Sequence, residues 1–193
     1  MNRLGDVVEQ LRRDGVRPVV PFVTAGFPDL DACRGALRGA KDAGCRLVEI
    51  GVPFSDPVAD GPVIQAASQR ALAQGMTLAG SLELAAWAQR ELDVAVVLMG
   101  YLNPVLRMGA PAFTRAAAAA GVAGVIVPDL PLEESALLGA ALADAGIDLE
   151  QVAERAVQHT RQPAAECRRV ALRSAAGLDA EQRHGIIDEP GEE

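Results

Sequence analysis

One stretch decides the fold of this protein: Val48-Glu49-Ile50-Gly51-Val52-Pro53-Phe54-Ser55-Asp56-Pro57-Val58-Ala59-Asp60-Gly61. It continues an apolar strand predicted over residues 46–50, and an acid such as Glu49 is costly there unless the site uses it. Prolines at positions 53, 57 and 62 keep the next segment out of regular structure. This loop carries Asp56 and Asp60, and a helical pattern follows it. A strand, an acidic loop and a helix in this order are typical of an active-site edge in a parallel α/β fold.

The same alternation of strand and helix continues along the chain. Apolar runs predict strands, and apolar positions at helical spacing predict helices between them. Pro21 is a defect inside the first strand because it cannot donate a ladder hydrogen bond. The pattern indicates a parallel sheet of four βα units with a fifth strand begun. We expect strands at residues 19–23, 46–50, 94–98, 124–127 and from 146, and helices at 2–14, 29–42, 62–74, 77–92, 111–120 and 132–145.

Composition excludes several classes of protein. The chain has 193 residues and a net charge of −8, which argues against nucleic acid or an anionic membrane as partner. We expect no transmembrane segment and no signal peptide. Half of the residues are hydrophobic but only 3% are aromatic, so the core should be aliphatic. The three cysteines lack metal-site spacing and are expected to be reduced thiols of a cytoplasmic protein.

Four runs in order carry a family resemblance. They are Phe-Val-Thr-Ala-Gly-Phe-Pro at residues 22–28, the stretch 48–61, Leu-Met-Gly-Tyr-Leu-Asn-Pro at 98–104 and Val-Pro-Asp-Leu-Pro-Leu-Glu-Glu-Ser at 127–135. Together they resemble the tryptophan synthase α subunit over about residues 1–149. The resemblance implies a (β/α)8 TIM-type barrel that is incomplete, with four to five βα units. Residues 150–193 form a divergent tail that we expect to be helical or disordered, and no glycine-rich phosphate loop is found there.

The resemblance also implies an activity. The family cleaves indole-3-glycerol phosphate to indole and glyceraldehyde 3-phosphate in tryptophan biosynthesis, and it needs no metal or organic cofactor. By resemblance, Glu49 is the general acid/base and Asp60 accepts a hydrogen bond from the indole N–H. Both burial and neighbouring carboxylates are expected to raise the pKa of Glu49. Missing phosphate contacts would impair cleavage by this chain.

Further residues receive roles by the same resemblance. The indole pocket would be lined by Phe22, Ile64, Leu98 and Gly100, and no tyrosine ring contact is expected at position 100. The β subunit, in an α2β2 heterotetramer, would be met by Pro53, Asp56, Asp129 and Pro131.

Each of these assignments has a plainer alternative. The pocket residues could be ordinary core, the partner residues could be loop formers, and a strand-end glutamate is often an ion-pair partner. His159 and His184 are expected to be solvated rather than metal ligands. For the whole chain, the alternatives are a non-catalytic module that binds the β subunit and another phosphate-binding barrel enzyme.

Overall fold

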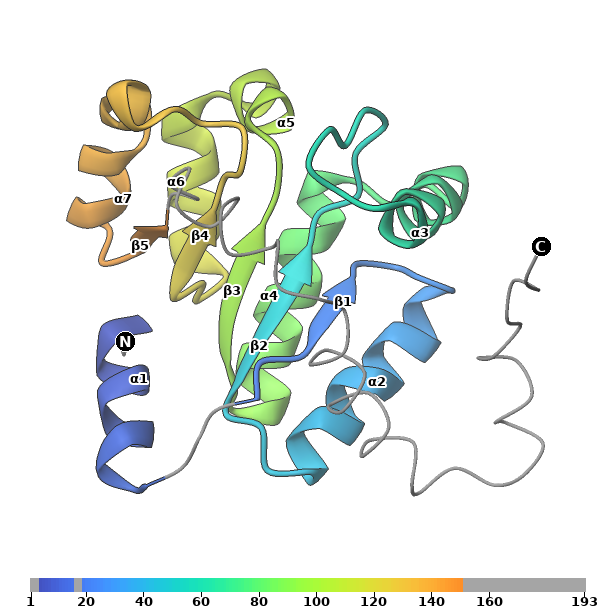
Figure 1. The fold of residues 1–193 in the computed structure, drawn as a ribbon, viewed down its shortest axis with the longest axis vertical. Coiled ribbons are helices and arrows are strands. Elements are labelled where there is room, and N and C mark those ends of the chain that lie inside the picture. The colour runs from blue at the N-terminus through green and yellow to red at the C-terminus, as the bar shows by residue number, and fades with distance from the viewer. Residues whose placement is uncertain (1–3, 16–18, 151–193) are drawn as a thin grey trace, which may run out of the picture. The chain divides into compact units, whose positions relative to one another are not determined.

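The computed structural model describes residues 4–15 and 19–150 of the chain. Five parallel strands form one sheet in the order β1-β2-β3-β4-β5, so each strand lies beside its neighbour in the sequence (Figure 1). This arrangement confirms the predicted parallel α/β fold. In chain order the elements are α1 (Leu4–Arg13), β1 (Phe22–Thr24), α2 (Leu30–Asp42), β2 (Leu47–Gly51), α3 (Pro62–Ala73), α4 (Leu78–Leu92), β3 (Ala95–Met99), α5 (Leu102–Met108), α6 (Ala110–Ala119), β4 (Gly124–Ile126), the 3-10 helix η1 (Leu132–Leu137), α7 (Gly139–Asp144) and β5 (Asp148–Glu150).

The sheet has two faces, and the strand register assigns side chains to them. Glu49 on β2 is aligned with Phe22 on β1 and with Val97 on β3. Aligned residues of neighbouring strands project on the same face, and the next residue of each strand projects on the other. Ile50 and Leu98 are therefore on the opposite face, where both are buried in the hydrophobic core. Glu49 thus projects from the face that this core does not cover.

The core lies between the sheet and the helices. Helix α4 contacts α2 and α6 and also packs on β2 and β3. The buried side chains are almost all aliphatic or alanine, as the low aromatic content predicts, and full burial of each large one is worth about 1.5–3 kcal/mol. Members of this core include Leu37, Val48, Ile50, Leu84, Ala85, Val96, Leu98, Phe113 and Ala117.

Local signals set the starts of three helices where the sequence predicts them. The carboxylate of Asp29 accepts the Ala32 N–H at 2.8 Å and caps α2. The hydroxyl of Thr77 accepts the Gly80 N–H at 3.1 Å and caps α4. Pro62 occupies the first turn of α3, where its missing N–H costs nothing.

Two predicted elements differ from the structure. The first strand is shorter than residues 19–23, because Val19 and Val20 are exposed and Pro21 contributes only its carbonyl, which accepts the Glu49 N–H at 2.9 Å. The single helix predicted over residues 132–145 is instead η1 followed by α7, with a break at Leu138. Leu138 is fully buried, so the residue at the break packs into the core and does not form an exposed turn.

Helix α5 is not predicted by the sequence pattern. It has seven residues, and the N–H of its first residue, Leu102, donates to the Asp129 carboxylate at 2.8 Å. Asp129 lies in the loop after β4, so the group that starts α5 is remote in the chain. The start of this helix therefore cannot be predicted from the sequence of residues 102–108 alone.

Two expectations concern the rest of the chain. The expectation of a helical or disordered tail falls on residues 151–193, outside the described part, as do His159 and His184. Among the helices of residues 4–15 and 19–150, none is both long enough and apolar enough to cross a membrane.

Candidate active site

Glu49 lies within β2, half-buried on the face opposite the main core. Its backbone N–H donates to the Pro21 carbonyl at 2.9 Å. This bond holds the strand in place and does not involve the side-chain carboxyl. Burial raises the pKa of the Glu49 carboxyl. Repulsion by neighbouring carboxylates, the second cause that the sequence analysis expects, does not contribute to this shift. Glu49 is therefore a carboxyl that takes up a proton more readily than an exposed glutamate does.

Asp60 lies in the loop between β2 and α3, and Tyr101 holds it there. The Tyr101 hydroxyl accepts the Ala59 N–H at 3.0 Å and donates to the Asp60 carboxylate. Burial raises the pKa of Asp60, and the hydrogen bond from Tyr101 partly opposes this shift. One buried hydroxyl thus fixes two successive residues of the acidic loop.

The acidic loop is braced at both of its ends. The Phe54 ring stacks on the Tyr101 ring with centroids 5.2 Å apart. At the other end, the Gln65 side-chain amide donates to the Asp60 carbonyl at 2.9 Å. Tyr101 itself is only 2% exposed, so its ring is a fixed support for the loop. These contacts preorganise the Asp60 carboxylate before any ligand arrives.

Tyr101 is the residue that sequence reasoning missed. The sequence analysis expects no tyrosine ring contact at position 100, but the ring is supplied by the next residue. The available signal was the single tyrosine of the chain, two residues after the end of the third strand. A lone tyrosine at a strand end is a weak signal, because only the folded loop brings Asp60 to it.

Phe22 and Ile64 are the first two residues that the sequence analysis assigns to the indole pocket. Phe22 shares the sheet face of Glu49, and its ring lies over Gly51, where a built Cβ would come within 2.4 Å of the ring. Ile64 is half-buried in the first turn of α3, four residues after Asp60. Phe22 is thus on the sheet face of Glu49, and Ile64 is close to Asp60 in the chain; their role in a substrate pocket stays a prediction.

Leu98 and Gly100 do not lie on the sheet face of Glu49. Leu98 is 1% exposed and belongs to the helix-covered core on the sheet face opposite Glu49. A Cβ at Gly100 would meet the Val52 side chain at 3.2 Å, which places this position against the same core. The assignment of both residues to the substrate pocket is therefore corrected. Met99, aligned with Gly51, is the β3 residue on the Glu49 side of the sheet.

The four residues assigned to a partner surface have different environments. Asp56 is exposed and accepts a hydrogen bond from the Ser55 hydroxyl at 2.7 Å. Asp129 is exposed and caps α5, and Pro131 is exposed two residues later. Pro53 is buried at the start of the acidic loop, so it acts on the loop's shape rather than presenting a surface.

Metal ligation is not suggested by the described part of the chain. Within residues 4–15 and 19–150, no group of three or more histidine, cysteine, aspartate or glutamate side chains is arranged to hold a metal ion. The free thiols of Cys33 and Cys45 lie away from one another in the sequence and are unpaired.

Comparison with known proteins decides the family. The model of the family described as tryptophan synthase alpha chain matches residues 8–167. This chain belongs to the tryptophan synthase alpha chain family. The match continues past residue 149, where the sequence analysis places the end of the resemblance.

Curated members of the tryptophan synthase alpha chain family are close in sequence. The alpha chain of Laribacter hongkongensis is 52% identical over 136 residues, which are 70% of this chain and 52% of that protein. The alpha chain of Dechloromonas aromatica is 47% identical over 149 residues, which are 77% of this chain and 56% of that protein. The chain therefore spans about half the length of the curated relatives it matches.

Solved structures agree with the family assignment. Tryptophan synthase from M. tuberculosis in an open form aligns with a TM-score of 0.73 and 36% identity, over 78% of this chain and 60% of that one. Tryptophan synthase subunit alpha from Legionella pneumophila aligns with a TM-score of 0.71 and 34% identity, over 77% of this chain and 57% of that one. The five-stranded sheet is thus part of the (β/α)8 barrel of the tryptophan synthase alpha chain family.

Proposed function

We propose that this chain supplies the acid/base pair of an indole-3-glycerol phosphate lyase. The observation that carries the proposal is the placement of two half-buried carboxyls, Glu49 and Asp60, whose pKa values are both raised by burial. One extends from the sheet face that the core leaves uncovered, and the other is held by Tyr101 in the loop that follows the same strand. Carboxyls with perturbed pKa values are a common property of catalytic sites.

Glu49 is suited to moving protons. Cleavage releases indole, which leaves well only when its C3 carbon is protonated, and a hydroxyl of the glycerol side chain must lose a proton in the same reaction. A carboxyl whose pKa lies nearer to neutral pH performs both transfers better than an ordinary glutamate. Burial of Glu49 shifts its pKa in that direction.

Asp60 is suited to accepting a hydrogen bond from the substrate. The hydrogen bond from Tyr101 favours its carboxylate form and opposes the effect of burial. A carboxylate accepts several hydrogen bonds, so contact with Tyr101 leaves capacity for an indole N–H. The positive charge that develops on the indole ring would be stabilised by this anion.

The substrate's phosphate needs groups that the described residues do not provide. In barrels of this class, phosphate is bound by loops after strands seven and eight, whereas residues 19–150 form five strands. Loss of two or three charge-assisted hydrogen bonds to phosphate would weaken transition-state binding by roughly 3–9 kcal/mol. A test of the carboxyls therefore has to supply the rest of the barrel.

The test joins residues 1–149 of this chain to the remaining C-terminal part of the Dechloromonas aromatica alpha chain. Indole release from indole-3-glycerol phosphate is measured for the parent chimera and for Glu49→Gln and Asp60→Asn. We expect each substitution to lower kcat/KM by at least about a hundredfold. The exposed Asp31→Asn variant on α2 is the matched control. If either site variant keeps near-parental turnover while the control is active, that residue's role is refuted.

We also propose that the loops at this edge of the sheet bind a tryptophan synthase β subunit in the cytoplasm. Asp56 is exposed on the acidic loop, and the nearby Val58 side chain is 84% exposed, so both are accessible to a partner. The free thiols of Cys33 and Cys45 fit a reducing compartment. Binding of the chimera to an immobilised β subunit should weaken in a Val58→Asp variant and persist in the Asp31→Asn variant. Equal binding by both variants would remove the acidic loop from the interface.

A further inference from the structure

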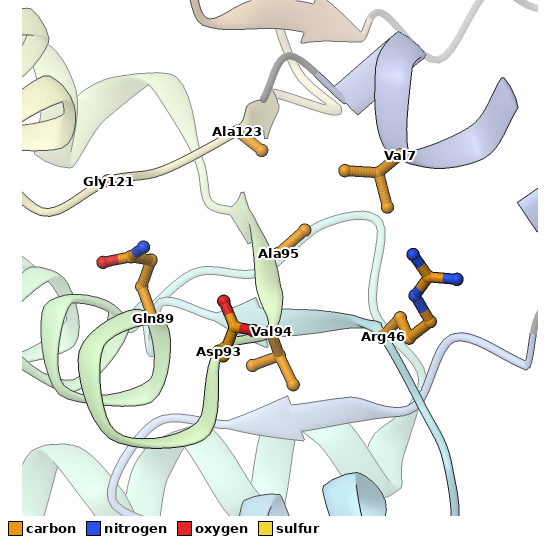
Figure 2. A pocket seen from close by; sticks show the side chains of 8 residues that line it. All are labelled: Val7, Arg46, Gln89, Asp93, Val94, Ala95, Gly121 and Ala123. Carbon is orange, nitrogen blue, oxygen red and sulfur yellow. The ribbon is translucent and has the colours of Figure 1, made fainter. Parts of the chain in front are cut away.

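A cavity at the amino ends of the strands lies away from the acidic loop, which follows the carboxyl end of β2. It has a volume of about 330 Å³ and lies between α1 and the segments that enter β2, β3 and β4 (Figure 2). Its Arg46 guanidinium is already paired at 2.7 Å with Asp14, directly after α1. This ion pair ties α1 to the start of β2. Contacts that position the carboxyls therefore have to be found at the other end of the sheet.

Helix α3 follows the acidic loop and packs through small side chains. Its buried residues are Ala67, Ser68 and Ala71. Helix α4, by contrast, buries Leu82 and Leu84 among others. A buried leucine side chain contributes roughly two to four times as much as a buried alanine methyl group. Polar contacts are therefore more important for the position of α3 than for that of α4.

The far end of α3 is anchored to the loop that joins β1 to α2 (Figure 1). Nε of Arg70 donates to the Pro28 carbonyl at 3.1 Å, and the side-chain amide of Gln74 donates to the same carbonyl at 2.6 Å. A carbonyl oxygen has two lone pairs, so it can accept both bonds. The Arg70 guanidinium carbon also lies 5.9 Å from the centroid of the Phe27 ring. Two donors thus converge on one acceptor that is 42 and 46 positions away from them in the sequence.

The near end of α3 is joined to the acidic loop. The Gln65 side-chain amide donates to the Asp60 carbonyl at 2.9 Å, and the Gln65 backbone N–H donates to the Gly61 carbonyl at 3.0 Å. The helix has 12 residues and is therefore about 18 Å long. Its backbone hydrogen bonds make it move as one body, so a displacement of the far end also displaces the residues at the near end.

We infer that Arg70 and Gln74 are positioning residues for Asp60. They fix the far end of α3 on the loop after β1, and α3 transmits this constraint to the acidic loop. The loops that follow β1 and β2 are thereby held in a fixed relation to one another. The consequence for catalysis rests on the proposed function of Asp60, whereas the constraint on the position of Asp60 does not.

The first experiment follows the acidic loop in the full chain without substrate. Hydrogen exchange of the Ala59 amide reports on this loop, because the N–H donates to the Tyr101 hydroxyl at 3.0 Å. A double variant, Arg70→Met with Gln74→Met, removes both donors and keeps side-chain length and helix propensity. We expect the Ala59 amide to exchange about tenfold faster. The Val97 amide, inside β3, should change less, because the loss is local to the loop.

The Asp60 carboxyl gives a second readout in the same chain. Burial has a larger effect on its pKa than the hydrogen bond from Tyr101, so an Asp60 that moves toward solvent should titrate closer to its ordinary value of 3.8. A carbon NMR titration measures this midpoint in the parent and in the double variant. Arg90→Met, at an exposed arginine of α4, is the matched control and should titrate as the parent does.

The consequence for catalysis is measured in the chimera with the Dechloromonas aromatica C-terminal part. The double variant should lower kcat by about tenfold to a hundredfold and leave KM within about twofold, because Asp60 acts on charge that develops in the transition state. Unchanged turnover by Asp60→Asn would refute the proposed function, while the exchange and titration results would still decide the positioning role. Equal acceleration of the Ala59 and Val97 amides, or an unchanged Asp60 midpoint, would show that Arg70 and Gln74 only stabilise the fold and would overturn the inference.

Discussion

Replacing Tyr101 with phenylalanine tests how the acidic loop is held. The substitution keeps the ring that stacks on Phe54 at 5.2 Å and removes only the hydroxyl. That hydroxyl accepts the Ala59 N–H at 3.0 Å and donates to the Asp60 carboxylate. A hydrogen bond to a charged group contributes about 1.5–3 kcal/mol. Because Ala59 is exposed and Asp60 is only half-buried, water replaces part of this loss.

We therefore expect Tyr101→Phe to lower the free energy of unfolding by about 1–2 kcal/mol. In urea this corresponds to a midpoint lower by roughly 0.5–1 M. The control is Thr114→Val, which also removes one buried hydroxyl, but one without a hydrogen-bond partner in the described part of the chain. Its stability should be unchanged or slightly increased, because no hydrogen bond is lost.

The same variant should change the titration of Asp60. The hydrogen bond from Tyr101 lowers the pKa of Asp60, so its loss leaves the effect of burial unopposed and raises that pKa further. The assay is a carbon NMR titration of the Asp60 carboxyl in the parent and in Tyr101→Phe. An unchanged midpoint of this titration, together with an unchanged urea midpoint, would refute the reasoning that Tyr101 fixes the acidic loop.

Three further predictions concern other contacts of the candidate site. Glu49→Gln should raise the free energy of unfolding at neutral pH, because burial disfavours the ionised form of Glu49. The pKa of Glu49 in the folded chain is raised above its ordinary value of 4.5, so below pH 4.5 the carboxyl is protonated in both states and urea unfolding should show no such stabilisation. Gly51→Ala should cost about 1–3 kcal/mol, because its Cβ would lie 2.4 Å from the Phe22 ring, and thermal unfolding measures this cost. Asp129→Ala should cost about 0.5–2 kcal/mol through loss of the cap on Leu102, whereas Asp129→Asn should keep most of it; equal losses in chemical denaturation would contradict the capping role.

Much of the fold follows from local pattern. Helix α2 begins where Asp29 can cap it and α4 where Thr77 can, and both caps are made within four residues of the chain. The strands β2 and β3 are apolar on both faces except at Glu49, which is why their positions were predicted to within a residue. Residues near in sequence fix such features, so sequence alone reveals them.

Features that depend on distant partners were not predicted. Helix α5 begins because Asp129 reaches Leu102 across 27 positions of the chain. The exposed pair Val19 and Val20 has a strand-like sequence, but β1 begins only at Phe22, where pairing with Glu49 starts. In both cases tertiary contact overrides a local preference.

The sequence by itself determined the parallel α/β fold, the family and the acids Glu49 and Asp60, because these depend on residues contiguous in one motif. Only the tertiary structure decided which side of the sheet each strand residue faces. A shift of one residue exchanges the two faces of a strand, so Leu98 lies in the core while Met99 lies on the Glu49 side. Only the folded chain brings the Tyr101 hydroxyl to Asp60, since 41 positions separate them in the sequence. The acids are a property of the sequence, whereas their orientation and their pKa values arise from the burial and hydrogen bonds that folding creates.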